Sequence, residues 1–122
     1  MLKFKFLLWM LATLIKRAIR KNPKAAAYVA GKDLKFQIMT TGGIGRHYRI
    51  ANGSISSAAG IGNDAAFTLT FSNPNAGFRI LSAKDSQDAF LQGLHDEELF
   101  ITGDFVAVLW FQGLTNFLQP PK

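Results

Sequence analysis

The stretch LFITGDFVAVLWFQGLTNFLQP, residues 99–120, decides how this chain folds. It opens with a short apolar segment at 99–102, is interrupted by Gly103, and continues over 105–118 without a single charged residue. Asp104 stands where a carboxylate can accept hydrogen bonds from the first free amides of a helix and complement its dipole. We therefore predict a strand over 99–102, followed by a helix over 105–118.

The polar residues of this last helix form one narrow stripe. They follow the spacing i, i+3, i+4 and i+7, which leaves most of the circumference apolar; they are Gln112, Thr115, Asn116 and Gln119. One face of a sheet cannot cover so wide an apolar surface. Two interpretations stay open: the helix is buried in a core and also forms a dimer contact, or its spare apolar surface lines a cavity for a hydrophobic ligand.

The segments upstream predict a sheet. Residues 34–40 (LKFQIMT) alternate between apolar and polar side chains, as a half-buried strand does. Two further strands, 46–50 and 54–61, flank Asn52-Gly53, which is a strong two-residue hairpin signal. We expect these three strands to form an antiparallel meander.

The next part of the chain predicts one strand and two short helices. Residues 65–71 (AAFTLTF) place three large apolar side chains on one face of a fourth strand. Residues 72–74 (SNP) begin a helix that runs to Lys84, because a capping side chain precedes a proline at the first helical position. Asp85 or Ser86 caps the second helix.

We treat residues 1–22 as a basic, apolar N-terminal helix and residues 23–122 as a folded domain. The run at 6–15 (FLLWMLATLI) is too short to span a bilayer, which takes about 20 residues. A cleaved signal peptide would end in small uncharged residues, whereas KRAIRK follows here. Pro23 ends the helix, because proline lacks the amide donor and restricts the residue before it. We expect a short Ala-rich turn to follow it.

Two roles for this N-terminal helix remain open and are compatible. An interfacial helix would insert its large apolar side chains into a membrane surface while its cations meet anionic lipid; the candidate membrane contacts are Lys3, Lys5, Trp9, Lys16, Arg17, Arg20 and Lys21. Alternatively, one helical face simply covers the domain; that face carries Phe4, Leu7, Leu8, Leu11, Ile15 and Ala18.

The charge is unevenly distributed along the chain. The net charge is +6, yet residues 1–35 hold nine Lys and Arg against one Asp, giving +8, while the remainder holds five against seven, giving −2. A nucleic-acid reader spreads its cations over a folded face, so we expect no nucleic-acid partner. With 48% hydrophobic residues and 11 Phe, the chain supplies a core easily.

The sequence offers no pattern for catalysis or metal binding. The chain has no cysteine, and neither His47 nor His95 has the spacing to carboxylates that a metal site or proton relay needs. The acidic run 96–98 (DEE) is most simply a solvated turn, and TTGGIGR at 40–46 is a hairpin loop, since a strand follows it. We expect no catalytic residue, no metal and no cofactor.

The run at 99–120 resembles the C-terminal signature of the sterol carrier protein type two family: a short strand ending in Gly, an apolar last helix, and a close in Leu-Gln-Pro. The order before it is also similar, with a meander, the strand AAFTLTFS, and two short helices in NAGFRILSAK and SQDAFLQGLHDE. The resemblance covers about residues 34–120. Family members with a peroxisomal address end differently from QPPK at 119–122, so we expect no peroxisomal targeting.

This resemblance implies an α/β (α+β) fold, in which helices cover a twisted, mostly antiparallel five-stranded sheet and enclose a hydrophobic tunnel. It also implies non-catalytic binding of sterols, fatty acyl groups, phospholipids or similar molecules. The lining would come from the apolar strand faces and the last helix, with one polar contact at Gln112; the candidate ligand-binding residues are Phe36, Ile38, Phe67, Leu69, Phe71, Phe78, Phe90, Leu94, Phe100, Phe105, Leu109, Gln112 and Phe117.

We therefore expect a lipid-binding or lipid-transfer domain that is cytoplasmic and peripherally associated with an anionic membrane. The rival interpretation is an accessory subunit that uses the same surfaces to bind a partner enzyme of lipid or isoprenoid-quinone biosynthesis. A third is a small enzyme on an apolar substrate, which would need a polar group inside the tunnel.

Overall fold

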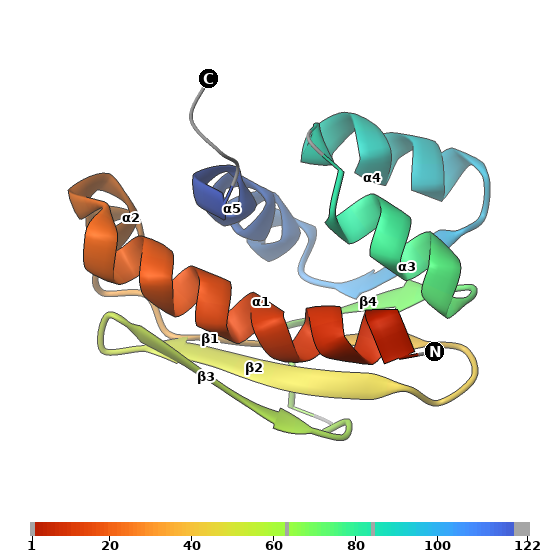
Figure 1. Ribbon diagram of the computed structural model, residues 1–122, viewed down its shortest axis with the longest axis horizontal. Coiled ribbons are helices and arrows are strands. Elements are labelled where there is room, and N and C mark those ends of the chain that lie inside the picture. Colours follow the sequence, from red (N-terminus) through yellow and green to blue (C-terminus); the bar gives the residue numbers. More distant parts are fainter. Residues whose placement is uncertain (1, 63, 84, 119–122) are drawn as a thin grey trace.

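The computed structural model of the chain describes residues 2–62, 64–83 and 85–118, which form five α-helices, five strands and a final 3-10 turn. Figure 1 shows the helices stacked on one side of the sheet. In chain order the elements are α1 (Leu2–Lys21), α2 (Pro23–Val29), β1 (Leu34–Thr40), β2 (Gly45–Ala51), β3 (Ser54–Ala59), β4 (Phe67–Phe71), α3 (Pro74–Leu81), α4 (Ser86–His95), β5 (Leu99–Gly103), α5 (Phe105–Thr115) and η1 (Asn116–Leu118).

The strands lie in the order β3-β2-β1-β4-β5. Neighbouring strands are antiparallel except for the central pair β1 and β4, which is parallel. The predicted meander and the mostly antiparallel sheet are confirmed. Asn52 and Gly53 both have positive φ, 55° and 73°, which is the backbone that a two-residue hairpin between twisted strands requires. β3 ends at Ala59, two residues before its predicted end, and β4 begins at Phe67, two residues after its predicted start.

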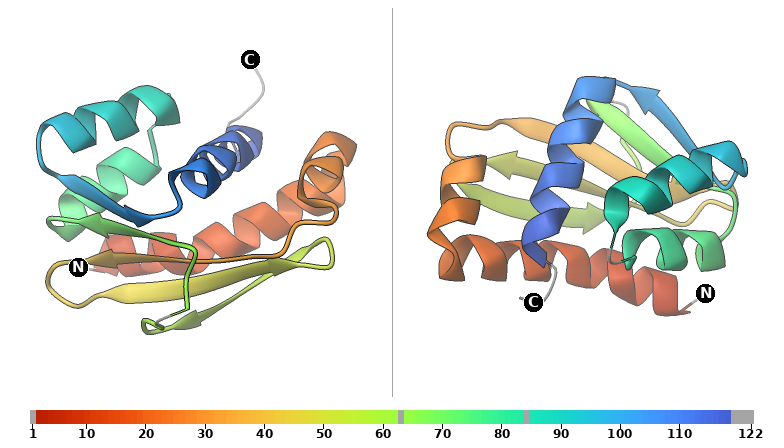
Figure 2. Two further views of the ribbon diagram at one scale, coloured as in Figure 1. Left: turned by 180° about the vertical axis from the view of Figure 1, so that it is seen from behind. Right: turned by 90° about the horizontal axis from the view of Figure 1, so that it is seen from above.

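The two faces of the sheet have different environments. Helices cover one face, which we call the covered face; the other, the open face, carries only the connection from β3 to β4 in the described part of the chain (Figures 1 and 2). Two contacts hold this connection, which we call the crossing segment, to β1. Gly62 N donates to Gln37 Oε1 at 3.0 Å, and Lys35 pairs with Asp64 at 2.8 Å. This crossover brings β4 alongside β1 in the parallel direction.

Large apolar side chains from β1, β2 and β4 fill the centre of the covered face. The ring of Phe36 stacks on Tyr48, 4.9 Å between centroids, and on Phe67, 5.1 Å. Phe111 of α5 closes this cluster from above, 4.9 Å from Phe36. All four rings are at most 1% exposed, so they form the dry centre of the domain.

The prediction of an Ala-rich turn after α1 is wrong, because residues 23–29 form the helix α2. Asn22 caps it by accepting a hydrogen bond from Lys24 N at 2.9 Å, and Pro23 occupies the first helical position. A proline that ends one helix can begin the next, since its missing amide is not needed there. α2 therefore turns the chain back toward the sheet.

The other predicted helix starts are confirmed by their caps. Asn73 accepts from Ala76 N at 2.8 Å, and Asp85 from Asp88 N at 3.0 Å. α3 ends at Leu81, short of the predicted Lys84, which lies outside the described residues. The last helix ends at Thr115 and continues as η1; residues 119–122, including the predicted polar position Gln119, also lie outside the described residues.

One face of α1 belongs to the same core as the sheet. The predicted covering stripe is largely confirmed, with Leu7 and Ala18 only half-buried; its buried members are Phe4, Leu8, Leu11 and Ile15. Ala12, which the predicted stripe did not include, is also buried. Tyr48 Oη donates to Leu8 O at 2.6 Å, which joins α1 to β2, and burial raises the pKa of this tyrosine. In the described residues no helix is both long and apolar enough to cross a bilayer.

Gly103, between β5 and α5, is the glycine with the tightest backbone contact, and its replacement by Ala is expected to destabilise the protein. Its φ is +100°, and an added Cβ would lie 2.3 Å from Ala66 O. We expect Gly103→Ala to lower the free energy of unfolding by at least about 2 kcal/mol in urea titration. Gly42→Ala is the control, because a Cβ there meets only Thr40 Oγ1 at 3.8 Å; an equal loss in both variants would contradict this assignment.

Candidate functional site

The outward side of α5 is an exposed apolar surface. Asp104 fixes the start of the helix by accepting from Val106 N at 2.9 Å and Ala107 N at 3.2 Å. The buried side of the helix faces the sheet. The opposite side, which we call the outer α5 face, consists of Phe105, Val106 and Leu109, which are 52%, 74% and 49% exposed. These three neighbouring side chains make the outer α5 face a candidate contact surface for an apolar partner.

Tyr28 holds the C-terminal half of α5 against α2. Its hydroxyl donates to Trp110 O at 2.6 Å, and its ring stacks on the indole of Trp110 with 5.1 Å between centroids. Lys32 Nζ lies 4.9 Å from the Trp110 ring centroid. Gly113 makes room for this contact, since a Cβ there would lie 2.3 Å from the Tyr28 hydroxyl. Burial raises the pKa of the Tyr28 hydroxyl above its ordinary value.

Side chains occupy the space directly beneath α5. Phe111 reaches down to Phe36 and Phe67, at 4.9 and 5.9 Å between ring centroids. Four cavities of about 340 to 480 Å³ are lined by described residues elsewhere in the molecule, and none of these four has a lining residue in α5. The hydrophobic tunnel implied by the family resemblance therefore remains a prediction.

The structure brings most of the predicted ligand-binding residues to the covered side of the sheet. Six are buried in the core: Phe36, Ile38, Phe67, Leu69, Phe71 and Phe90. Four are half-buried: Phe78, Leu94, Gln112 and Phe117. Phe105 and Leu109 lie on the outer α5 face. Phe100 is not brought together with the others, because it pairs with Thr70 on the open face.

α1 also presents an exposed outward side, opposite its buried stripe. Its N-terminal half carries Leu2, Phe6 and Trp9, which are 84%, 59% and 52% exposed, and the rings of Phe6 and Trp9 lie 5.9 Å apart. Its C-terminal half carries four exposed cations, which we call the basic patch: Lys16, Arg17, Arg20 and Lys21. No carboxylate of the described residues lies within ion-pair distance of the patch.

Two apolar residues of this surface, Leu2 and Phe6, are absent from the sequence-based set of membrane contacts, as is Val106 from the set of ligand contacts. Phe6 and Trp9 are three residues apart, the spacing of neighbours on one helical face. Phe6 also lies opposite the stripe that begins at Phe4. Their position on the helix, opposite the buried stripe, is the sequence signal that could have identified Phe6 and Leu2 as exposed apolar residues.

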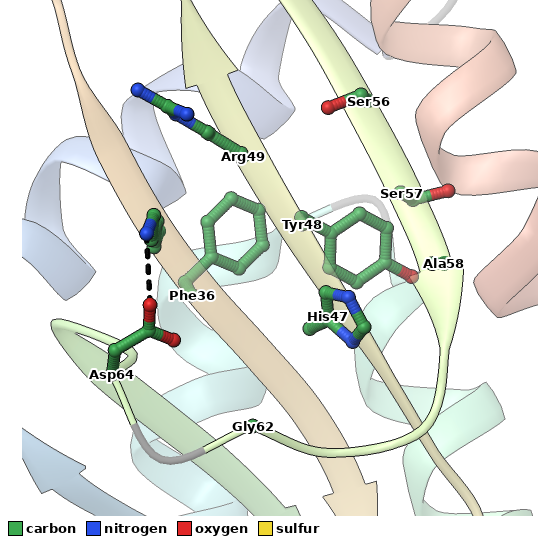
Figure 3. A pocket seen from close by; sticks show the side chains of 10 residues that line it. Phe36, His47, Tyr48, Arg49, Ser56, Ser57, Ala58, Gly62 and Asp64 are labelled. Atoms are coloured by element: carbon green, nitrogen blue, oxygen red, sulfur yellow. Dashed lines mark hydrogen bonds and ion pairs between the residues drawn. The ribbon is translucent and has the colours of Figure 1, made fainter.

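A cavity of about 360 Å³ with polar and aromatic lining residues lies on the open face, beside the connection from β3 to β4 (Figure 3). Both of its cations have acidic partners: Lys35 pairs with Asp64 of the lining at 2.8 Å, and Arg49 pairs with Asp33, outside the lining, at 3.4 Å. The hydrogen bond from Lys35 lowers the pKa of Asp64. His47 Nδ1 lies 3.0 Å from Gly60 O, so a backbone carbonyl orients the ring.

The acidic residues do not gather into a metal site. Glu98 pairs with Arg79, and His95 Nδ1 lies 3.1 Å from Asp96 Oδ1, at an exposed helix end. The described residues contain no group of three or more His, Cys, Asp or Glu side chains that could hold a metal ion.

No protein-family model and no curated protein matches this chain. A solved structure described as the UbiJ-SCP2 ubiquinone synthesis protein matches with a TM-score of 0.65 and 16% identity, over 88% of this chain and 87% of that chain. The inverting sec-alkylsulfatase Pisa1 from Pseudomonas sp. matches with a TM-score of 0.55 and 15% identity, but over 80% of this chain and only 14% of the enzyme. Sterol carrier protein 2 from Yarrowia lipolytica matches with a TM-score of 0.48 and 17% identity, over 92% and 91% of the two chains.

Proposed function

We propose that this chain, which has the sterol-carrier fold of the matched ubiquinone synthesis protein, binds a lipid or another long apolar molecule without transforming it. The observation that carries the proposal is the outer α5 face. α5 has no charged residue, and three of its apolar side chains remain exposed although the core below is already filled. A ligand that covers this face removes apolar surface from water, which stabilises the complex by about 25 cal/mol per Å².

The ligand would contact Phe105, Val106 and Leu109 first. The sequence-predicted lining beneath the helix becomes accessible only if α5 moves away from the sheet, because Phe111 now fills that space. The hydrogen bond from Tyr28 to Trp110 O is a fastening between α5 and α2 that such a movement would break. We propose that the tunnel opens in this way when an apolar chain binds.

We further propose that α1 holds the protein at an anionic membrane surface. Its buried stripe fixes the helix to the sheet, so its outward side is presented rigidly. Phe6 and Trp9 would enter the headgroup boundary, where aromatic rings are favoured, and the basic patch would meet anionic lipid. This places the ligand-binding domain where apolar molecules are available.

A second candidate function is that of an accessory subunit in quinone biosynthesis. It is favoured by the match in fold to a ubiquinone synthesis protein along most of both chains. In this case the outer α5 face would be covered by a partner protein, since an exposed apolar surface is equally typical of a protein interface.

Mass spectrometry of the full chain purified without detergent tests the first function. Under native conditions we expect an adduct that dissociates on denaturation and that extracts into organic solvent as a lipid. A spectrum showing only the bare chain, together with one co-purified protein in fixed ratio, would reject lipid binding in favour of the accessory role.

Leu109→Glu is expected to abolish binding of a fluorescent fatty acid. The substitution puts a carboxylate in the middle of the outer α5 face, and burying it against a hydrocarbon chain costs several kcal/mol. Asn75→Glu is the matched control, because it adds the same charge to an exposed position in the first turn of α3, where the helix dipole tolerates an acid. Unchanged fluorescence titration for Leu109→Glu would show that this face does not bind the ligand.

A further inference from the structure

A second cavity, of about 470 Å³, lies at the end of the molecule where α1 begins. It is enclosed by the first turns of α1, the turn between β1 and β2, and the end of β3, at the same end as the N-terminus in Figure 1. Among the described residues that line it are two cations, Lys5 and Arg46, and no carboxylate; the remainder are Leu8, residues 42–45, Ala59 and Gly60. We call it the Lys5–Arg46 cavity.

Arg46 is a charged residue on the covered face of the sheet. In the β-ladder it stands between Ile38 and Ala59, and it is half-buried. Its Nε donates to Ser57 Oγ at 3.0 Å, but no carboxylate of the described residues pairs with it. Arg49, three residues further on the open face, pairs with Asp33. A guanidinium carries five N–H donors, and Nε is the one that a described residue uses here, so the remaining donors of Arg46 can bind an external anion.

The walls of the cavity allow an anion to come close to the backbone. Four of its lining residues are glycines, and two of them, Gly43 and Gly60, have φ near +100°. Without side chains these turns leave room for an anion beside Lys5 and Arg46, but the amides of Gly43 and Gly60 already donate to Thr40 O and Gly45 O, at 3.1 Å each, so the two cations supply the donors. Thr40 Oγ1, which is buried and has no hydrogen-bond partner among the described residues, lies 3.8 Å from where a Cβ on Gly42 would stand.

We propose that the Lys5–Arg46 cavity binds a phosphate group, as a monoester or diester. The planar guanidinium of Arg46 would donate from the floor, while the flexible ammonium of Lys5 would close over the anion from the exposed rim. Since α1 also carries Phe6 and Trp9, a phospholipid headgroup and a free phosphate are the two sources. The inference deepens the proposed membrane role by naming the recognised group, but the site itself needs no membrane.

Solution NMR of the full chain in vesicle-free buffer tests this site. Inorganic phosphate and dihexanoyl phosphatidic acid below its critical micelle concentration are titrated separately, and the amide shifts of residues 42–45 and Gly60 are followed. We expect saturable shifts at these amides, and Lys5→Gln and Arg46→Gln each to weaken binding about tenfold, the effect of losing one charge-assisted hydrogen bond. Arg49→Gln, on the opposite face of the same strand, and Lys24→Gln, on α2, are the controls and should change nothing.

The two probes distinguish the sources. Tighter binding of the lipid assigns the site to a headgroup, and equal binding assigns it to free phosphate. No saturable shift with either probe, or an equal loss in Arg49→Gln and Arg46→Gln, would overturn the proposal. Arg46→Gln also removes the hydrogen bond to Ser57, so a loss of binding in this variant has a structural explanation as well. Lys5 is exposed and makes no such bond to a described residue, so Lys5→Gln tests the site without disturbing the fold. The NMR titrations involve neither the outer α5 face nor vesicles. A failure of the phosphate site can therefore be distinguished from a failure of the proposed lipid binding or membrane association.

Discussion

Reversing the charge of the basic patch on α1 is expected to release the protein from anionic vesicles. Each cation near an anionic surface contributes about 1 kcal/mol, so removing four of them lowers the partition coefficient by roughly a thousandfold, and adding four carboxylates lowers it further. The variant is Lys16→Glu, Arg17→Glu, Arg20→Glu and Lys21→Glu together, measured by sedimentation with vesicles that contain phosphatidylserine.

A control of equal net charge separates the patch from the total charge. Replacing Lys24, Lys32, Lys84 and Lys122 by Glu also removes four positive and adds four negative charges, which takes the net charge from +6 to −2 in both variants. These cations lie outside α1, so we expect most of the binding to remain. Circular dichroism verifies the fold of each variant. Unchanged sedimentation of the α1 variant, or equal loss in both, would dispose of the membrane role of the patch.

Phe4→Ala is expected to destabilise the protein by about 3–5 kcal/mol, the usual cost of emptying a buried aromatic site. Phe4 is fully buried, its ring lies 6.0 Å from Phe71 in an edge-to-face arrangement, and a Cβ on Gly77 would lie 2.4 Å from it. The site cannot collapse easily, because α3 and β4 hold it on two sides. Urea titration followed by tryptophan fluorescence measures the loss.

Phe6→Ala is the matched control on the same helix. Phe6 is 59% exposed, so its removal should change stability by no more than about 0.5 kcal/mol. It should nevertheless weaken vesicle binding by about tenfold, since it removes an apolar ring from the proposed membrane contact. If the two variants lost equal stability, α1 would not have the two-sided arrangement described above.

Local signals were sufficient to predict most elements. Alternation over residues 34–40 predicts β1, the left-handed pair Asn52-Gly53 predicts the hairpin, and Asn73 and Asp104 predict helix starts. Each is a short-range effect of backbone geometry or of one capping side chain. The sequence order also predicted the sterol-carrier fold, which the match in structure confirms.

Long-range arrangement was harder to predict. β5 has apolar residues on both faces, so its pattern alone does not say whether Phe100 or its neighbours Leu99 and Ile101 face the helices. The pairing of β5 with β4 decides which of these residues face the helices, because it sets Leu99 and Ile101 beside Phe71 and Leu69. Lys5 and Arg46 lie 41 positions apart in the sequence. Only the packing of α1 on β2 and β3 brings them to one cavity, and no local pattern indicates such a pairing.

The position of α1 in the chain has a consequence for biosynthesis. α1 is made before every strand it rests on, and its final neighbours include η1, the last described element. Until the ribosome has delivered the sheet and the closing turn, the stripe of Phe4, Leu8 and Ile15 lacks the partners that bury it in the folded domain. During that interval the helix is a target for chaperones, or for a bilayer that shelters it until the sheet arrives.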